Sequence, residues 1–259
     1  MYPILFQVGE FILPSWHAFY VLGALTAYWL MLYIYRIAPS EQLSEKDLGR
    51  IYIWTYIAGY FGARVGAIVT EDGIGLENFA GLYQFGSMMM YGGAIGGGVA
   101  ALIFIGLKRL PYRTCSDILI PAFLGAVSIG RIGCFLNGDD FGKAVSPDAG
   151  DHYPFWAVVF PNLGDNVHRY PVQLVESVVV AVIVIISIYI YSHRKIPPGF
   201  VGIGAGAAYA IARFFIEMLR GDNRGEFLFG VFSPSQAISI ALLILFRVIA
   251  GRMVRRRTQ

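Results

Sequence analysis

The chain has 259 residues, of which 56% are hydrophobic and only 14% are charged. Soluble domains carry about 25% charged residues, so this composition excludes an ordinary soluble enzyme and indicates an integral membrane protein. The net charge of +3 is typical of a basic rim on the cytoplasmic side of a membrane. No phosphate-binding loop or dinucleotide motif is present, and nucleic acid is not an expected partner.

A transmembrane helix needs about 20 mostly apolar residues. Seven stretches of the sequence meet this need, and we predict them as membrane spans: 16–35, 50–70, 87–107, 117–136, 172–192, 200–219 and 232–250. The predicted fold class is therefore an all-α integral membrane protein with seven transmembrane helices. We predict a single membrane domain over residues 1–259. No internal repeat is evident, which disfavours an inverted-repeat transporter.

Basic residues indicate the orientation, because loops rich in Lys and Arg stay in the cytoplasm. They gather in loops 36–50, 108–116 and 193–199 and in the C-terminal tail, whereas the alternate loops hold acids such as Glu71, Asp72, Glu77, Asp148 and Asp151. We predict an outside N-terminus and a cytoplasmic C-terminus. The first span lacks a basic segment before it, so we expect it to be retained.

One loop is long enough to form a structure of its own. Residues 137–170 lie outside between spans four and five and are rich in Asp, Pro and aromatic residues. At this length a small periplasmic or extracellular cap is more typical than disorder. Within it, WAVVF (156–160) is typical of a short strand.

Five ionisable residues fall within the predicted spans: Arg64, Arg131, Glu176, Arg213 and Glu217. A charge inside lipid is costly, so such residues indicate a functional site. A lone arginine could instead extend to the headgroups, but three in spans two, four and six favour a shared polar pocket. Arginine presents a planar fork of donors that suits phosphate. The sequence therefore predicts a pocket for an anionic phospholipid headgroup, towards the outer leaflet.

Helical spacing groups these residues with others. Tyr209, Arg213, Glu217 and Arg220 follow one face of span six, at offsets of four, eight and eleven residues. Gln173 and Glu176 lie three apart in span five, just inside a helix that Pro171 can begin.

Span four and the glycine-rich third span carry two further signals. Arg131 and Cys134 share a helical face, and Asn137 followed by Gly138 marks the helix exit. In YGGAIGGGVA (91–100), small residues allow helices to approach closely, which is our interpretation of the glycines after Gly93. Gly92 and Gly93, directly after Tyr91, could instead open backbone amides towards a ligand.

The stretch GRIGCFLNGDDFG (130–142) resembles the signature of the bacterial prolipoprotein diacylglyceryl transferases, which reads roughly G-R-hydrophobic-G-N-F-hydrophobic-N-G-E-x-x-G. Further pieces match that family in order: GARVG (62–66), YGGAIGG (91–97), RYPVQLVES (169–177), ARFFIEMLR (212–220) and SPSQAISI (233–240). Seven spans with the N-terminus outside is also that family's topology.

The resemblance implies transfer of the diacylglyceryl group of phosphatidylglycerol to the lipobox cysteine of a preprolipoprotein, with release of glycerol phosphate, in the bacterial cytoplasmic (inner) membrane. By motif position, Arg131 and Arg213 match the family's two essential arginines and are predicted to bind the phosphate. The remaining residues predicted to bind lipid or peptide are Arg64, Gly92, Gly93, Asn137, Gly138, Asp139, Gly142, Gln173, Glu176, Tyr209, Glu217 and Arg220.

The chain departs from the family pattern at the base. Tyr91-Gly92-Gly93 replaces His-Gly-Gly, in which the histidine is the proposed base. A tyrosine is a poor base at neutral pH, so three interpretations stay open: Tyr91 orients the phosphate through its hydroxyl, His17 supplies an imidazole, or the acceptor differs.

Other departures are Cys134 for Asn, Asp139 for Glu, Trp16-His17-Ala18 for Trp-Tyr-Gly, and Tyr170 for His. The alternatives to the transferase are a divergent member that transfers a lipid-derived group to another acceptor, and a non-catalytic lipid-binding protein or transporter. We expect no metal or cofactor, because the histidines are scattered without ligand spacing. Cys115 and Cys134 are not expected to pair.

Overall fold

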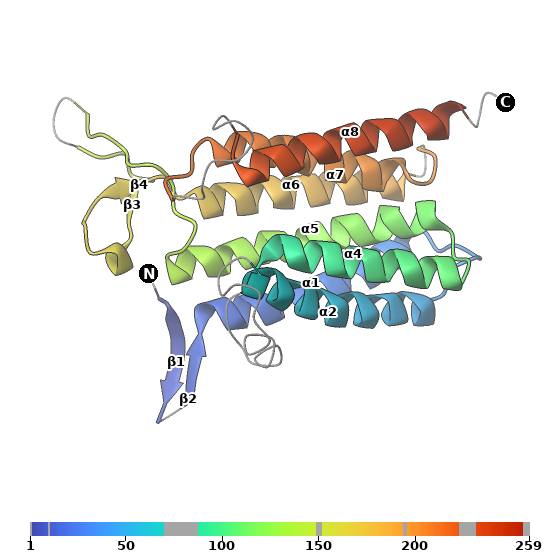
Figure 1. Cartoon of the computed structure of the whole chain (residues 1–259), viewed down its shortest axis with the longest axis horizontal. Helices are drawn as coiled ribbons and strands as arrows, with labels where there is room; N and C mark the ends of the chain where they lie inside the picture. Colours follow the sequence, from blue (N-terminus) through green and yellow to red (C-terminus); the bar gives the residue numbers. More distant parts are fainter. Residues whose placement is uncertain are drawn as a thin grey trace. The chain divides into compact units, whose positions relative to one another are not determined.

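The computed structural model describes residues 2–9, 11–69, 88–148, 152–193, 196–222 and 232–255. It is mostly helical, with two short antiparallel strand pairs (Figure 1). The long helices are α1 (Ser15–Ile37), α2 (Glu45–Ala67), α4 (Met90–Leu107), α5 (Tyr112–Asn137), α6 (Val172–Ser192), α7 (Phe200–Glu217) and α8 (Pro234–Arg255). The strand pairs are β1 (Ile4–Val8) with β2 (Phe11–Pro14), and β3 (Val158–Val159) with β4 (His168–Arg169).

Within the described residues, six helices are long and apolar enough to cross a membrane: all of the long helices except α2. The chain is therefore a multi-pass membrane protein. Helix α2 overlaps the predicted span 50–70, but its apolar stretch is interrupted by Arg50 and Arg64 and by several Tyr and Gly residues, which lower its mean hydropathy. The count of seven spans and the orientation stay predictions. Several residues behind them lie outside the described residues: Glu71, Asp72, Glu77, Asp151, Arg194, Lys195, Arg224, Arg256 and Arg257.

The predicted spans agree with the helices except at some ends. Helix α5 begins at Tyr112, five residues before the predicted boundary, because its first turn is polar and carries no hydrophobic signal. Helix α8 continues through basic residues to Arg255. The predicted strand at 156–160 is confirmed for Val158–Val159. The hairpin of β1 and β2, which leads directly into α1, was not predicted.

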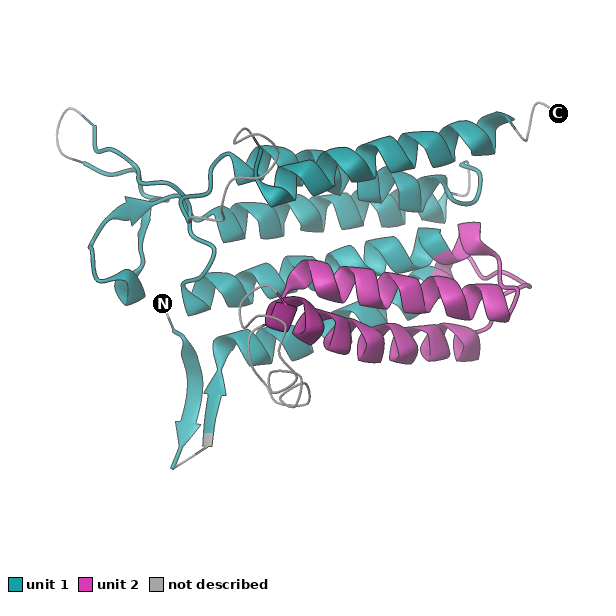
Figure 2. Cartoon of the chain, in the orientation of Figure 1, with its two compact units in different colours: residues 1–34, 116–259 teal, residues 35–115 magenta. Residues whose placement is uncertain are grey.

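The chain forms two compact units, one of residues 1–34 and 116–259 and the other of residues 35–115 (Figure 2). In the second unit, α2 and α4 approach each other at glycine. A Cβ added to Gly62 would overlap the carbonyl oxygen of Gly92, and the reverse holds for Gly92. The same holds after Gly93, where a Cβ at Gly96 would lie 2.6 Å from the Ala58 carbonyl oxygen and one at Gly97 3.0 Å from that of Thr55, so close packing is confirmed for these two glycines. At the start of α2, the Ser44 hydroxyl accepts a hydrogen bond from the Asp47 amide at 3.1 Å.

In the first unit, α5 packs against three other helices. A Cβ at Gly23 of α1 would lie 3.0 Å from the Ala126 carbonyl oxygen. Ser128 of α5 and Ser177 of α6 each donate a hydroxyl to the other's carbonyl at 2.8 Å. Such polar contacts join helices in a bilayer, where apolar burial alone discriminates little between partners.

The third contact of α5 caps a helix. The buried Asp117 carboxylate accepts the backbone amides of Gly199 at 2.6 Å and Gly202 at 2.7 Å. Gly199 is the N-cap residue of α7 and Gly202 lies in its first turn, where the amides have no intrahelical acceptors. Asp117 therefore fixes the start of the helix that carries Arg213 and Glu217.

Candidate functional site

The signature stretch ends α5 with a tight turn. The amides of Gly138 and Asp139 both donate to the Cys134 carbonyl, at 2.9 and 3.1 Å, and Gly138 adopts a φ of +87°. Glycine is the usual residue at a left-handed helix C-terminus. Asp140 is also left-handed, with φ +59°. The turn reverses the chain, so the Asp140 side chain reaches back to Arg131 of α5.

Backbone contacts then tie this turn to the ends of two other helices. The Gly142 amide donates to Tyr170, just before α6, at 3.2 Å. The Lys143 amide donates to Leu219, just after α7, at 2.8 Å, and the Gly221 amide donates to Phe141 at 3.0 Å. A Cβ at Gly142 would overlap the Tyr170 carbonyl. The glycine of the signature is therefore required by a close backbone approach.

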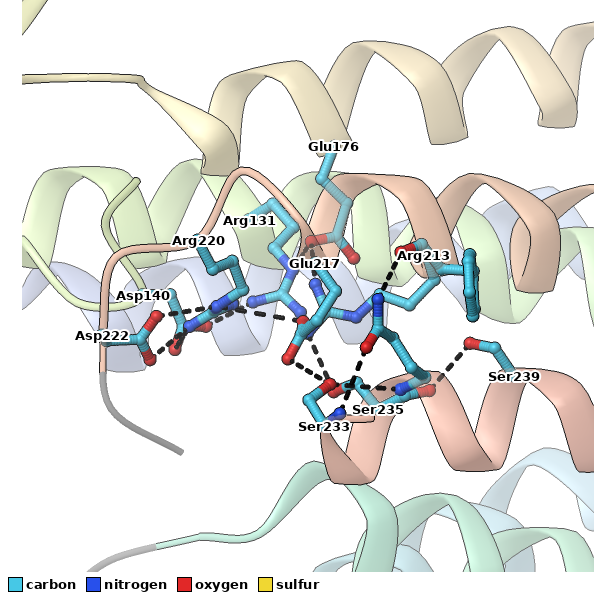
Figure 3. Close-up of polar contacts among 12 residues, drawn as sticks. Arg131, Asp140, Glu176, Arg213, Glu217, Arg220, Asp222, Ser233, Ser235 and Ser239 are labelled. Carbon is cyan, nitrogen blue, oxygen red and sulfur yellow. Dashed lines mark hydrogen bonds and ion pairs between the residues drawn. The ribbon is translucent and has the colours of Figure 1, made fainter. Parts of the chain in front are cut away.

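Glu176 of α6 connects two arginines at the centre of the site (Figure 3). Its carboxylate lies 2.9 Å from Arg131 Nε and 2.9 Å from Arg213 Nη1, and it accepts the Tyr209 hydroxyl at 3.1 Å. The Glu176 side chain is only 1% exposed. A buried carboxylate with several donors holds each of them in a fixed orientation.

Arg213 has further partners on its own helix and on α8. Its Nη2 lies 2.7 Å from Glu217 and donates to the Ser235 hydroxyl at 3.2 Å (Figure 3). Glu217 in turn accepts the Ser233 hydroxyl at 3.0 Å. The start of α8 therefore completes the surroundings of Arg213.

That start is a capping box. The Ser233 amide donates to the Gln236 side chain at 3.1 Å, and the Gln236 amide donates to the Ser233 hydroxyl at 3.3 Å. Reciprocal bonds of this kind satisfy two amides at the helix end and fix its geometry. They also fix the position of Ser235, which contacts Arg213.

Arg220, just after α7, is itself buried and contacts the two more exposed acids of the site. Its guanidinium contacts Asp140 at 2.6 Å and Asp222 at 2.7 Å. Burial disfavours the charged form of Arg220, but the hydrogen bonds and charges of Asp222 and Asp140 outweigh it and raise the pKa of Arg220 above its usual range. The second oxygen of Asp140 lies 2.5 Å from Arg131 Nη1.

We call this group the arginine–carboxylate cluster: Arg131, Asp140, Glu176, Arg213, Glu217, Arg220 and Asp222. Among the described residues, it holds three guanidinium groups and four carboxylates. The acids therefore outnumber the arginines, and two of them, Asp140 and Asp222, come from the segments that follow α5 and α7. The arginines are fixed in place by internal anions.

Most of the predicted site residues meet in this cluster or its turn. Arg131, Glu176, Tyr209, Arg213, Glu217 and Arg220 are joined by the contacts above, and Asn137, Gly138, Asp139 and Gly142 form the turn. Gln173 donates its side-chain amide to the Asp139 carbonyl at 2.5 Å. The Asp139 carboxylate accepts the Asn137 side-chain amide, and within the described residues it forms no ion pair. Of the two aspartates in the turn, Asp140 is the one that contacts the arginines.

The remaining predicted residues belong to other helices. Arg64 on α2 and Tyr91, Gly92 and Gly93 on α4 belong to the second unit. Arg64 is buried. The Gly93 amide donates to the Met89 carbonyl at 3.1 Å within the helical turn, so it is not open to a ligand in this structure. His17 packs its ring edge-on against Trp16 near the start of α1.

Sequence reasoning missed Asp140, Asp222, Ser233 and Ser235. For the serines a signal was available, because S-P-S-Q at 233–236 matches the capping-box pattern. For Asp140 and Asp222 the only signal was an acid next to a helix end that carries arginine. Cys115 and Cys134 are both free, as expected.

This geometry suits phosphate chemistry. Oriented guanidinium groups in a water-poor site stabilise negative charge without having to reorganise. The Tyr209 hydroxyl donates to the carboxylate of Glu176, which also contacts Arg131 and Arg213. Among the described residues, no group of three or more His, Cys, Asp or Glu side chains could hold a metal ion.

Comparison with known proteins agrees with this chemistry. The family model for prolipoprotein diacylglyceryl transferase matches residues 3–251. Proteins named phosphatidylglycerol–prolipoprotein diacylglyceryl transferase are 27% identical in Geobacter sulfurreducens and 28% identical in Bordetella avium, and each alignment covers 98% of this chain and 96% of the relative. A relative of that name from Lactobacillus acidophilus is 27% identical, over 93% of this chain and 86% of its own length. The chain therefore belongs to the prolipoprotein diacylglyceryl transferase family.

Proposed function

We propose that this protein transfers the diacylglyceryl group of phosphatidylglycerol to the lipobox cysteine of a preprolipoprotein. The cysteine thiol loses its proton and its sulfur forms a bond to the glyceryl carbon. The bond from that carbon to the phosphate oxygen breaks, and glycerol phosphate leaves with the electron pair. The observation that carries the proposal is the pair Arg131 and Arg213. Both are buried, both contact the carboxylate of Glu176, and both lie within the family's motifs.

The two arginines have the principal role. Negative charge grows on the departing phosphate, and a fixed guanidinium fork stabilises that charge more in the transition state than in the ground state. Glu176 positions both forks, and Tyr209 is positioned by the same carboxylate. Arg220, Glu217, Gln173 and the turn 137–142 shape the surroundings of the headgroup.

The thiol needs to become a thiolate, because the thiolate is the nucleophile. We propose Tyr91 and His17 as the two candidates for assisting this step. Tyr91 occupies the position of the family's histidine, but its hydroxyl is suited to orienting phosphate rather than to accepting a proton at neutral pH. The imidazole of His17 is suited to accepting one. Arg64 and Gly92 complete the proposed lipid- and peptide-binding residues, whereas the Gly93 amide is bonded to Met89 within its helix.

The proposed membrane topology and location of the enzyme follow from the same family resemblance. We propose that α2 is a seventh span, that the N-terminus lies outside and the C-terminus in the cytoplasm, and that residues 137–170 form a cap on the outside of a single membrane domain. Basic residues at the proposed cytoplasmic ends, such as Arg36, Arg109 and Arg252, support this orientation. The membrane is then the bacterial inner membrane, which holds both substrates.

The experiment uses purified protein in detergent with phosphatidylglycerol and a lipobox peptide, and it detects the product by mass. A diacylglyceryl mass gain on the cysteine peptide, and none on a peptide with serine in its place, is the expected result. Arg131→Ala and Arg213→Ala should abolish transfer while the protein still inserts in the membrane. Wild-type turnover by either variant would refute the role of that arginine. Binding of the lipid without any product would favour a different acceptor.

A further inference from the structure

Asp140 holds two arginines with one carboxylate. One of its oxygens lies 2.5 Å from Nη1 of Arg131, and the other lies 2.6 Å from Nη2 of Arg220. The two arginines come from different elements, α5 and the segment after α7. Two donors thus converge on a single anionic centre that offers two oxygens. A phosphate ester offers the same arrangement through two of its non-bridging oxygens.

Exposure separates Asp140 from the deeper acids of the cluster. The Asp140 side chain is 19% exposed, whereas Glu176 is 1% and Glu217 is 5% exposed. Water can therefore solvate the Asp140 carboxylate after a small displacement, while the release of a deeper acid would leave a charge buried and unsolvated. Of the two acids on Arg131, Asp140 is the one that a ligand can replace.

The fold does not depend on Asp140 for charge balance. Arg131 also contacts Glu176 at 2.9 Å, and Arg220 also contacts Asp222 at 2.7 Å. Each arginine therefore keeps a carboxylate when Asp140 moves away. The left-handed backbone of Asp140 is compatible with asparagine too, because Asn and Asp are the non-glycine residues that adopt this conformation most readily.

We propose that the carboxylate of Asp140 occupies the phosphate-binding position of the resting enzyme and that a phosphate ester displaces it to bind Arg131 and Arg220 together. The identification of that ester as the phosphatidylglycerol headgroup, or the glycerol phosphate product, rests on the proposed function. Exchange of one anion for another leaves the two guanidinium charges balanced throughout. Arg213, whose partners Glu176, Glu217 and Ser235 are all buried, then stabilises the charge of the phosphate from the buried side.

Binding without an acceptor peptide tests this exchange separately from transfer. The Kd of glycerol phosphate and of inorganic phosphate is measured by calorimetry on the detergent-purified protein, and phosphatidylglycerol is measured as a competitor. Asp140→Asn removes the competing charge and should tighten glycerol phosphate on the order of tenfold, a typical strength of coupling between two ligands. Asp140→Glu restores the carboxylate and should return the Kd towards wild type. Asp148→Asn is the control, since it removes an exposed acid of the same segment.

The outcomes separate the possibilities. Tighter glycerol phosphate binding in Asp140→Asn, with displacement by phosphatidylglycerol, supports the exchange at a headgroup site. Tighter binding of inorganic phosphate alone overturns the ester as the ligand. An unchanged or weaker Kd overturns the exchange itself, as does an Asp140→Asn protein that does not fold, because a replaceable partner cannot be one that the fold needs. If wild type binds as expected but transfers nothing, the proposed function fails and this inference stands.

Discussion

Replacing Glu176 by glutamine tests whether the cluster orients its arginines through one shared acid. The substitution keeps the shape of the side chain and removes its charge. Arg131 and Arg213 then lose the carboxylate that fixes them relative to each other, 2.9 Å from each. We expect both lower stability and slower transfer.

The size of the effect follows from the remaining contacts. Removing one partner of a buried ion pair costs about 3–5 kcal/mol. Arg131 keeps Asp140 at 2.5 Å and Arg213 keeps Glu217 at 2.7 Å, so we expect about 3 kcal/mol, the lower end of that range. For transfer, a misplacement of about 1 Å costs on the order of 10²-fold in rate, and we expect kcat to fall by that order.

The assay combines thermal unfolding in detergent with transfer kinetics on the folded fraction. Asp117→Asn is the matched control, because Asp117 is also a buried carboxylate but caps the start of α7 instead of contacting arginine. It should lower the free energy of unfolding by about 1–2 kcal/mol, as the loss of a helix cap does. The kcat of its folded fraction should stay close to wild type.

Three results would contradict the reasoning. If Glu176→Gln unfolds at the wild-type temperature, the shared acid contributes no net stabilisation. If it loses stability while kcat per folded molecule is unchanged, orientation by Glu176 is not needed for the reaction. Equal losses of kcat in Glu176→Gln and Asp117→Asn would show that kcat follows general stability.

Three further predictions concern single residues. Arg131→Lys keeps the charge but loses the fork of donors, so kcat should fall well below wild type while the protein still folds; wild-type kcat would contradict the role of the fork. Gly142→Ala places a Cβ against the Tyr170 carbonyl and should lower the free energy of unfolding by about 1–3 kcal/mol, measured by thermal unfolding, and an unchanged stability would show that the turn can widen. The hydrogen bond from Arg169 lowers the pKa of Asp165 to about 2. This pair therefore stabilises its loop fully above about pH 4 and ceases to do so as the pH falls through about 2. In Arg169→Gln, an NMR titration should show a higher pKa for the Asp165 carboxyl, and an unchanged pKa would exclude Arg169 as the cause of the shift.

The regular elements were predictable because their signals are local. Apolar length predicted every long helix of the described residues to within several residues, and offsets of three and four residues placed Tyr209, Arg213 and Glu217 on one face. The contacts of these residues with Glu176 could not be read from spacing, since they join α6 to α7 and α5. That buried charges need partners made a shared pocket and most of its members predictable, but not which pairs form within it.

The loops account for what the sequence did not reveal. The direction of the Asp140 side chain depends on two left-handed residues, Gly138 and Asp140, which lie on either side of Asp139. No periodicity of the sequence describes such a turn. One step in that turn decides whether Asp139 or Asp140 faces the arginines. The family signature favoured Asp139, and the backbone geometry selects Asp140.

The capping box of α8 has a consequence for biogenesis. Ser235 accepts a hydrogen bond from Arg213, and Ser233 donates one to Glu217. Both serines are synthesised after these partners. While α7 is already in the bilayer and α8 is not, both charged side chains lack these partners. The arrival of α8 therefore completes the polar centre late in membrane insertion, and a chain halted before this helix should be a preferred substrate for quality-control proteolysis.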